Sequence, residues 1–154
     1  ALYLIVRMFR RRLRNRDEAI ERKDSEIGES KTLLHESESE RSELRSVLMF
    51  KDKLVMSLQQ NPRYLSDAEW KRLEKILDDV CNRFTERLKS SFPGLTAAEL
   101  RIAVLLRFGF SGKQMAAMMG ISPTSVTKGK QRLKARVASA LPDGTSIDEF
   151  IATF

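Results

Sequence analysis

Residues 95–137 have the sequence LTAAELRIAVLLRFGFSGKQMAAMMGISPTSVTKGKQRLKARV, which is the most regularly patterned part of the chain. The stretch predicts three short helices in series, each preceded by a residue type that caps helix N-termini. Thr96 and Glu99 form a capping box, in which the hydroxyl accepts a free backbone N–H and the carboxylate accepts the N–H of the cap residue. Ser111 repeats the box with a glutamine three residues later. Ser122, followed by a proline, predicts the third start.

Two glycines predict where the first two of these helices end. Gly109 and Gly120 stand where a left-handed turn usually closes a helix. The expected second helix has about eight residues and its turn to the third about three, which is the spacing of a helix-turn-helix. Because the starts and stops agree with the apolar pattern between them, the stretch predicts this motif. A plain three-helix bundle with no role in DNA binding is the alternative.

The expected third helix, residues 123–138, has an apolar face that must pack inward. The residues on that face are Val126, Gly129, Leu133 and Val137. Glycine costs about 1 kcal/mol relative to alanine inside a helix. We therefore expect Gly129 to allow a close approach to the second helix, near Ala116 or Ala117.

The opposite face of the third helix carries Lys, Arg, Gln and Thr side chains, which suit a groove lined by phosphates. The candidates for contacts with base edges are Thr127, Lys128 and Gln131. The candidates for phosphate contacts are Lys113, Thr124, Lys130, Arg132, Lys134 and Arg136. A solvated basic surface is the alternative, but such a surface normally carries acids as well. No Asp or Glu lies between Arg101 and Lys134.

This stretch resembles the LuxR/GerE-type helix-turn-helix of bacterial transcription regulators. The residues that carry the resemblance are Leu95-Thr96 with Glu99, Gly109-Phe110-Ser111 with Lys113, Ala116, Ile121-Ser122-Pro123, Val126 and Leu133. It implies that the third helix binds double-stranded DNA in transcription, with RNA polymerase as a further partner. The chain departs from the family where Gln114 and Met115 replace a usual Glu-Ile, and where Gly129 replaces a common His. The family's fourth, dimerising helix is not evident.

Composition limits the chemistry that the chain can perform. It has 154 residues, a formal net charge of +7, one cysteine and one histidine. Cys81 alone excludes an internal disulfide and a cysteine metal cluster, and His35 alone excludes a histidine metal site or a catalytic triad. No segment has the spacing of a glycine-rich phosphate loop. We therefore expect no enzyme activity, no metal and no cofactor.

Residues 1–9 are mostly apolar, and residues 1–16 contain six arginines and no acidic residue. The six apolar residues at positions 1–6 cannot span a bilayer, which needs about 20. Since the chain begins without Met, we interpret residues 1–9 as the end of a transmembrane segment. The arginines would then place the rest in the cytoplasm, tethered to the inner membrane. An N-terminal amphipathic helix or a nucleic-acid-binding arm are the alternatives.

Residues 10–60 predict a basic juxtamembrane segment followed by a helical stalk. One apolar residue recurs every seven, interrupted by Arg41, at Leu13, Ile20, Ile27, Leu34, Leu48 and Val55. This is half of a coiled-coil seam, because the companion position is polar until Leu44. We expect a long helix that forms a weak homodimer, with its orientation undecided. A solvated single helix or partial disorder is the alternative.

Residues 64–154 predict a helical domain around the 95–137 motif, and no stretch keeps a strand's alternation for long, so the fold should be all-α. We expect one helix over residues 66–91 and a short helix from Ser146 to Phe154 that docks on it. The overall layout resembles the cytoplasmic ends of membrane-anchored regulators of the Bacteroides type. The function that we expect is a DNA-binding transcription regulator, the output domain of a sensor. The alternative is a helical protein-interaction module that keeps the motif without binding DNA.

Overall fold

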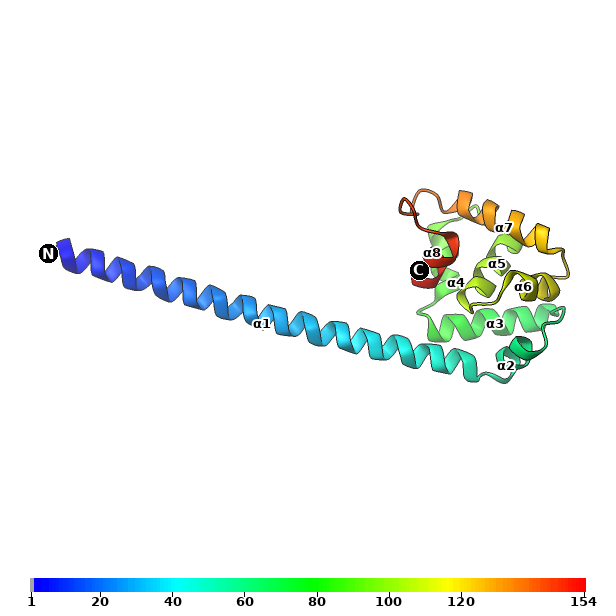
Figure 1. Ribbon diagram of the computed structural model, residues 1–154, viewed down its shortest axis with the longest axis horizontal. Coiled ribbons are helices and arrows are strands. Elements are labelled where there is room, and N and C mark those ends of the chain that lie inside the picture. The colour runs from blue at the N-terminus through cyan, green and yellow to red at the C-terminus, as the bar shows by residue number, and fades with distance from the viewer. Residues whose placement is uncertain (1) are drawn as a thin grey trace. The chain divides into compact units, whose positions relative to one another are not determined.

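The computed structural model of this chain describes residues 2–154, and every regular element in that range is a helix. The elements are α1 (Leu2–Lys51), α2 (Lys53–Gln60), α3 (Asp67–Val80), α4 (Phe84–Ser91), α5 (Ala97–Arg107), α6 (Gly112–Met119), α7 (Pro123–Arg136) and α8 (Ile147–Thr153) (Figure 1). The all-α fold and the long N-terminal helix are thus confirmed. The chain divides into two compact units, one up to Leu44 and one from Arg45 onward.

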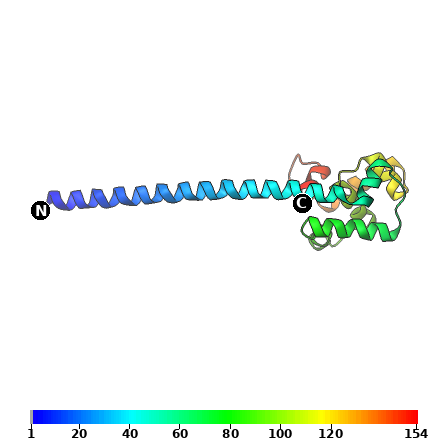
Figure 2. The ribbon, with the colours of Figure 1, turned by 90° about the horizontal axis from the view of Figure 1, so that it is seen from below.

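The first unit is the part of α1 up to Leu44, an uninterrupted helix (Figure 2). It contains no proline, and residues of high helix propensity such as Glu, Arg and Leu dominate it. The apolar residues of the seven-residue repeat that lie in this unit are exposed to solvent, by 54% for Leu13 and 61% for Leu34. Among the helices that the structure describes, none combines the length and the apolar character needed to cross a bilayer.

The helix that the sequence predicts through the whole stalk breaks at Asp52. This residue has extended backbone angles (φ −63°, ψ 131°), and its carboxylate accepts the N–H of Leu54 at 2.8 Å. After the break, α2 buries Val55 and Leu58 completely in the core of the second unit. The domain expected over residues 64–154 lies inside this unit, which also takes in α2 and the end of α1.

The prediction of one helix over residues 66–91 is wrong, because α3 and α4 are separate helices. Asn82 and Arg83 between them adopt left-handed backbone conformations, with φ of 51° and 56°. Arg83 gives α4 no side-chain cap. Instead, the carboxylate of Asp78 on α3 accepts the N–H of Thr85 at 2.7 Å and its hydroxyl at 2.5 Å. A side chain of the preceding helix thus takes the place of a local cap.

The C-terminal helix α8 closes the core of the second unit. It lies against α5 and α7. Its Phe150 meets Phe92 edge to face with ring centroids 6.4 Å apart, and Phe154 meets Phe84 in the same way at 6.0 Å. The C-terminal segment therefore contacts residues 66–91, as expected, through Phe84 of α4. It also contacts α5 and α7, which the sequence did not predict.

Candidate nucleic-acid interface

Helix α5 is the buried helix on which the motif is assembled. Its predicted capping box is present: the N–H of Thr96 donates to Glu99 Oε2 at 2.9 Å, and the N–H of Glu99 donates to Thr96 Oγ1 at 3.2 Å. The residues from Ile102 to Leu106 are all buried, so α5 has neighbours on nearly every side. Gly109 follows the end of α5 with φ of 79°, as its position in the sequence predicts.

Helices α6 and α7 form the predicted helix-turn-helix arrangement (Figure 1). Ser111 caps α6 by accepting the N–H of Gln114 at 3.3 Å. Gly120 ends α6 in a left-handed conformation, with φ of 66° and ψ of 35°. Ser122 then caps α7, and Pro123 occupies its first turn. The starts and stops read from the sequence are thus confirmed at these positions.

The segment between α2 and α3 braces the turn of the motif. The N–H of Leu65 donates to the carbonyl oxygen of Met118, at the end of α6, at 3.1 Å. The ring of Tyr64 lies against Gly120, where an added Cβ would come within 2.8 Å of the ring. Gly120 is therefore favoured by its left-handed backbone conformation, and a larger residue there would also have to displace the exposed ring of Tyr64. The turn that positions α7 is held from outside the motif.

The inward face of α7 fixes how this helix is rotated. Val126 and Leu133 are almost completely buried. Gly129 is also buried, and a Cβ there would lie 2.2 Å from Ile102 Cδ1. The close approach that the sequence predicts at Gly129 is thus present, but it is made to α5 and not to Ala116 or Ala117 of α6. One residue without a side chain lets α7 lie directly on α5.

The outward face of α7 carries most of the candidate residues. The exposed candidates on this helix are Thr124, Thr127, Lys128, Gln131, Arg132, Lys134 and Arg136. Thr124, Lys128 and Gln131 are spaced by four and three residues, so they form one stripe that points away from α5. Thr127 lies beside this stripe, and its hydroxyl donates to the carbonyl oxygen of Pro123 at 3.2 Å. The structure therefore brings the three base-contact candidates together on one accessible surface.

Two of the phosphate-contact candidates form ion pairs within the domain. Lys130 Nζ lies 3.0 Å from Asp148 Oδ1 of α8. Arg136 Nε lies 3.3 Å from Glu99 Oε2, whose side chain is only 4% exposed. Both residues occupy the flanks of α7 next to its buried face. They help to hold α7 on α5 and α8, which the sequence did not reveal because each partner is far away along the chain.

The remaining cations leave the outward surface positively charged. Among the residues that the structure describes, no ion pair involves Lys113, Lys128, Arg132 or Lys134. No acidic residue occurs between residues 100 and 142, which include all of α6 and α7. Lys113 lies in the first turn of α6, where the helix dipole disfavours a cation and favours an anion. An anionic partner would relieve this local cost.

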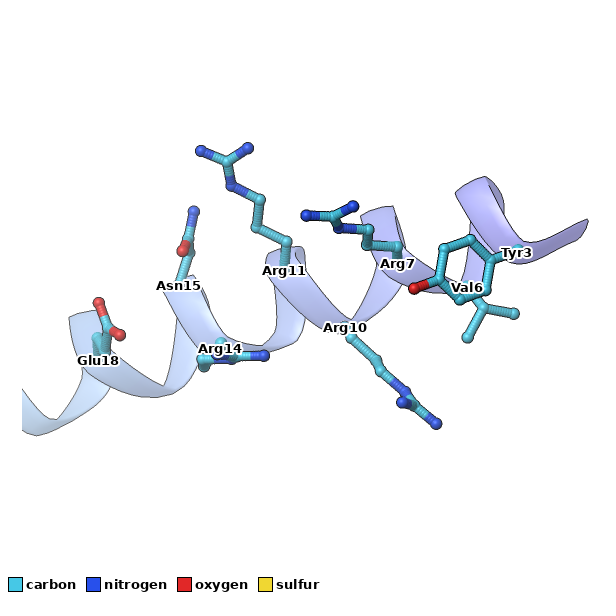
Figure 3. Close-up of a pocket in the computed structure, with 8 residues that line it drawn as sticks. All are labelled: Tyr3, Val6, Arg7, Arg10, Arg11, Arg14, Asn15 and Glu18. Carbon is cyan, nitrogen blue, oxygen red and sulfur yellow. The ribbon is translucent and has the colours of Figure 1, made fainter. Parts of the chain in front are cut away.

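A second cationic region lies in the first unit and has a different form. Figure 3 shows Arg7 and Arg11 extending to one side of α1 and Arg10 to the other. The hollow between them is only the space between neighbouring side chains of one helix. Tyr3 and Val6 precede these arginines, so apolar and cationic side chains are both exposed here. This region therefore exposes apolar and cationic side chains along one helix and is not a binding pocket.

Comparisons of the chain with protein-family models, with curated proteins and with solved structures gave no match. The interface is therefore interpreted from its own geometry and charge. It consists of one exposed helix with a cationic outward face, and an α-helix is an element that a DNA major groove can admit.

Proposed function

We propose that the second unit is a sequence-specific DNA-binding domain of a transcription regulator, with α7 as the helix that enters the major groove. The observation that carries this proposal is the division of α7 into two faces. Val126, Gly129 and Leu133 are buried on the face that packs against α5 and α6, while Lys128 and Gln131 on the other face are exposed and free of acidic neighbours on the helix. A helix fixed in this way can present the same side chains to every duplex.

The positions of the side chains favour different roles in this complex. Gln131 and Lys128 are long enough to reach base edges from the middle of the outward stripe. Thr127 uses its hydroxyl proton within the helix, so it would offer bases its methyl group and a hydroxyl acceptor. Lys134, at the edge of the stripe, suits phosphates, as do Thr124, Lys113 and Arg132. Lys130 and Arg136 would contribute mainly by holding α7 in place.

The resemblance of residues 95–137 to LuxR/GerE-type regulators supports the same function and adds RNA polymerase as a further partner. Such regulators act on promoters, so we propose that the two partners meet there. We also propose that the protein acts as a homodimer through its stalk, because two domains on one duplex read a longer site than one domain does. This part of the proposal is separate from the chemistry of α7.

We propose that the N-terminal end of α1 tethers the protein to the cytoplasmic face of the inner membrane. Residues 3–9 are mostly large and apolar, and they are exposed in the structure. The arginines that follow suit the anionic surface of a bilayer, where each basic residue contributes about 1 kcal/mol. Flotation of the full chain with vesicles containing anionic lipids, compared with neutral vesicles, tests the tether. Absence of the chain from the floated fraction with both vesicle types would contradict it.

The DNA-binding proposal is tested by selecting bound duplexes from a random pool with the full chain, and then measuring affinity against salt concentration. Gln131→Ala should weaken binding to the selected site by about 1–3 kcal/mol and binding to random DNA much less. Lys134→Ala should weaken all sequences alike and reduce the slope of log K against log salt by about one. Lys71→Ala is the matched control, because α5 and α6 separate its helix α3 from α7 (Figure 1).

Two outcomes would contradict this function. If Gln131→Ala affected selected and random DNA equally, Gln131 would have no role in reading bases. If the full chain, as monomer or dimer, showed no salt-dependent binding to any duplex, the motif would serve as a protein-interaction module. In that case Lys134→Ala and Lys71→Ala should behave identically.

A further inference from the structure

The first unit of the structure exposes an apolar seam that nothing covers. The seam consists of the residues at the first position, a, of a seven-residue repeat, which are Leu13, Ile20, Ile27 and Leu34. Each is more than half exposed, from 52% for Ile27 to 61% for Leu34. A row of four large aliphatic side chains along one side of a helix is the pattern that packs against a second helix. The charges beside the seam indicate which helix that is.

In a parallel two-stranded coiled coil, a residue at position g faces the e residue five positions later in the partner helix. In three of the g–e pairs of α1 both residues are charged, and in all three the two charges have opposite signs. They are Arg12 with Asp17, Glu26 with Lys31, and Glu40 with Arg45. No g–e pair along the helix brings like charges together. The sequence of α1 is therefore complementary to a second copy of itself.

Cations at the core positions a and d point to the same arrangement. There are three between residues 12 and 45, and the packing geometry places each one next to an acidic residue of the partner helix. The combinations are Arg16 at d beside Asp17 at e, Lys23 at d beside Asp24 at e, and Arg41 at a beside Glu40 at g. Among the residues that the structure describes, all ion pairs lie from Asp52 onward, so these stalk charges are not used within the chain.

Other alignments of two α1 helices fail on the same residues. In an antiparallel pair, a residues pack against d residues. With residues 12–45 fully overlapped, Leu13 meets Leu44, but Ile20, Ile27 and Leu34 meet Ser37, Ser30 and Lys23. In a parallel pair shifted by one repeat, Glu26 would face Glu38. Only the parallel pair without a shift makes all four a layers from Leu13 to Leu34 purely apolar, adds a Leu44 layer at d, and makes the facing charges complementary.

We propose that residues 12–45 of two copies of this chain form a parallel coiled coil in register. This inference specifies the orientation and register of the homodimer in the proposed function, and it does not depend on DNA binding. Because both stalks continue into their second units after Leu44, the two candidate DNA-binding domains would be attached at the same end of the coiled coil.

Disulfide crosslinking of the full chain tests the geometry directly. The native thiol is first removed by Cys81→Ala, and Ser30→Cys and Ser37→Cys are then made separately at d positions. In a parallel dimer in register, each new cysteine faces its own copy, within the distance a disulfide spans. Ser25→Cys, at the outward position f, is the matched control. In a glutathione buffer, both d variants should be dimers on non-reducing gels, and the control should stay monomeric.

Several outcomes of this experiment would overturn the proposal. An antiparallel dimer could crosslink at no more than one of the two d positions, because only the residue at its centre faces itself. A dimer shifted in register would crosslink only when Ser30→Cys and Ser37→Cys chains are mixed. A monomer, or a stalk bound to another protein, would give no more crosslinking at d than at f. None of these readouts involves DNA, so failure of the DNA-binding function would leave them unchanged.

Charge exchange supplies a second test that does not depend on the cysteines. The chains Glu26→Lys and Lys31→Glu each place like charges opposite each other in their own homodimers. In the heterodimer of these two chains, both g–e pairs again have opposite charges. An effect of either substitution within its own helix is the same in the homodimer and in the heterodimer, so it does not change their ratio. Native mass spectrometry of an equimolar mixture should show heterodimer well above the statistical half, by several-fold over each homodimer. A statistical distribution would contradict the parallel register.

Discussion

The contact between Gly129 of α7 and Ile102 of α5 offers a test of how the motif is packed. Gly129→Ala has two opposing effects on the free energy of unfolding. Alanine is about 1 kcal/mol more favourable than glycine in a helix interior. The new Cβ would lie 2.2 Å from Ile102 Cδ1, far inside van der Waals contact, and overpacking of this kind costs about 1–3 kcal/mol. We expect a net destabilisation of about 0–2 kcal/mol.

The sign of this effect should reverse when the clashing methyl group is removed. Ile102→Val deletes Cδ1, and the next nearest atom, Ile102 Cγ1, is 3.7 Å from the added Cβ, which is an ordinary contact. Ile102→Val alone should cost about 0.5–1.5 kcal/mol. In that background, Gly129→Ala should stabilise the domain by up to about 1 kcal/mol, since only the helix preference remains. The coupling energy of the cycle is then about 1–3 kcal/mol.

Urea unfolding of the four full-length variants measures this coupling. The fluorescence of Trp70 is the suitable signal, because it is the only tryptophan in the chain and is 2% exposed in the second unit. Far-UV circular dichroism would be dominated by the 50 residues of α1. If Gly129→Ala changed stability by the same amount in both backgrounds, to within about 0.5 kcal/mol, the close packing of α7 on α5 would be refuted.

Substitutions at Glu69, Asp52 and Gly120 test other parts of the second unit. The Arg63 guanidinium lowers the pKa of Glu69 to about 2 from its ordinary 4.5, so the higher melting temperature of wild type over Glu69→Gln should be present above pH 4.5 and vanish as the pH falls towards 2. Asp52→Ala should cost about 0.5–2 kcal/mol in urea unfolding through loss of the α2 cap, and Asp52→Asn much less. Gly120→Ala should cost at least about 1–2 kcal/mol of unfolding free energy because of the positive φ at this position. Adding Tyr64→Ala to this variant should restore only the part of the stability lost through the contact of the new Cβ with the ring.

The starts of α3, α5, α6, α7 and α8 were predictable from the sequence because their causes are local. A cap residue and its partner three positions later lie on the same turn, so Ser66, Thr96, Ser111 and Ser146 all form the boxes that their spacing predicts. The same holds for Gly120, where the backbone conformation selects the residue type. The stripe of candidate residues on α7 follows from helical periodicity alone. These features need no knowledge of the rest of the molecule.

What the sequence did not reveal depends on residues that are distant along the chain or on weak local signals. The break between α3 and α4 has no glycine or proline; Asn82 is its only local sign, and the cap comes from Asp78 on the preceding helix. The break at Asp52 has a cap residue in a run that otherwise favours helix. The partners of Lys130 and Arg136 lie 18 and 37 residues away. The local pattern therefore identified the cations of α7, but it did not show which of them form ion pairs within the domain.

The double use of Glu99 sets a limit on how the motif can be isolated from the chain. One carboxylate closes the first turn of α5 and also pairs with Arg136 in the last turn of α7. A fragment that stops before Arg136 would leave this buried acid without its cation, and would weaken a helix that begins some forty residues earlier. The shortest fragment that is expected to fold therefore has to include both Glu99 and Arg136.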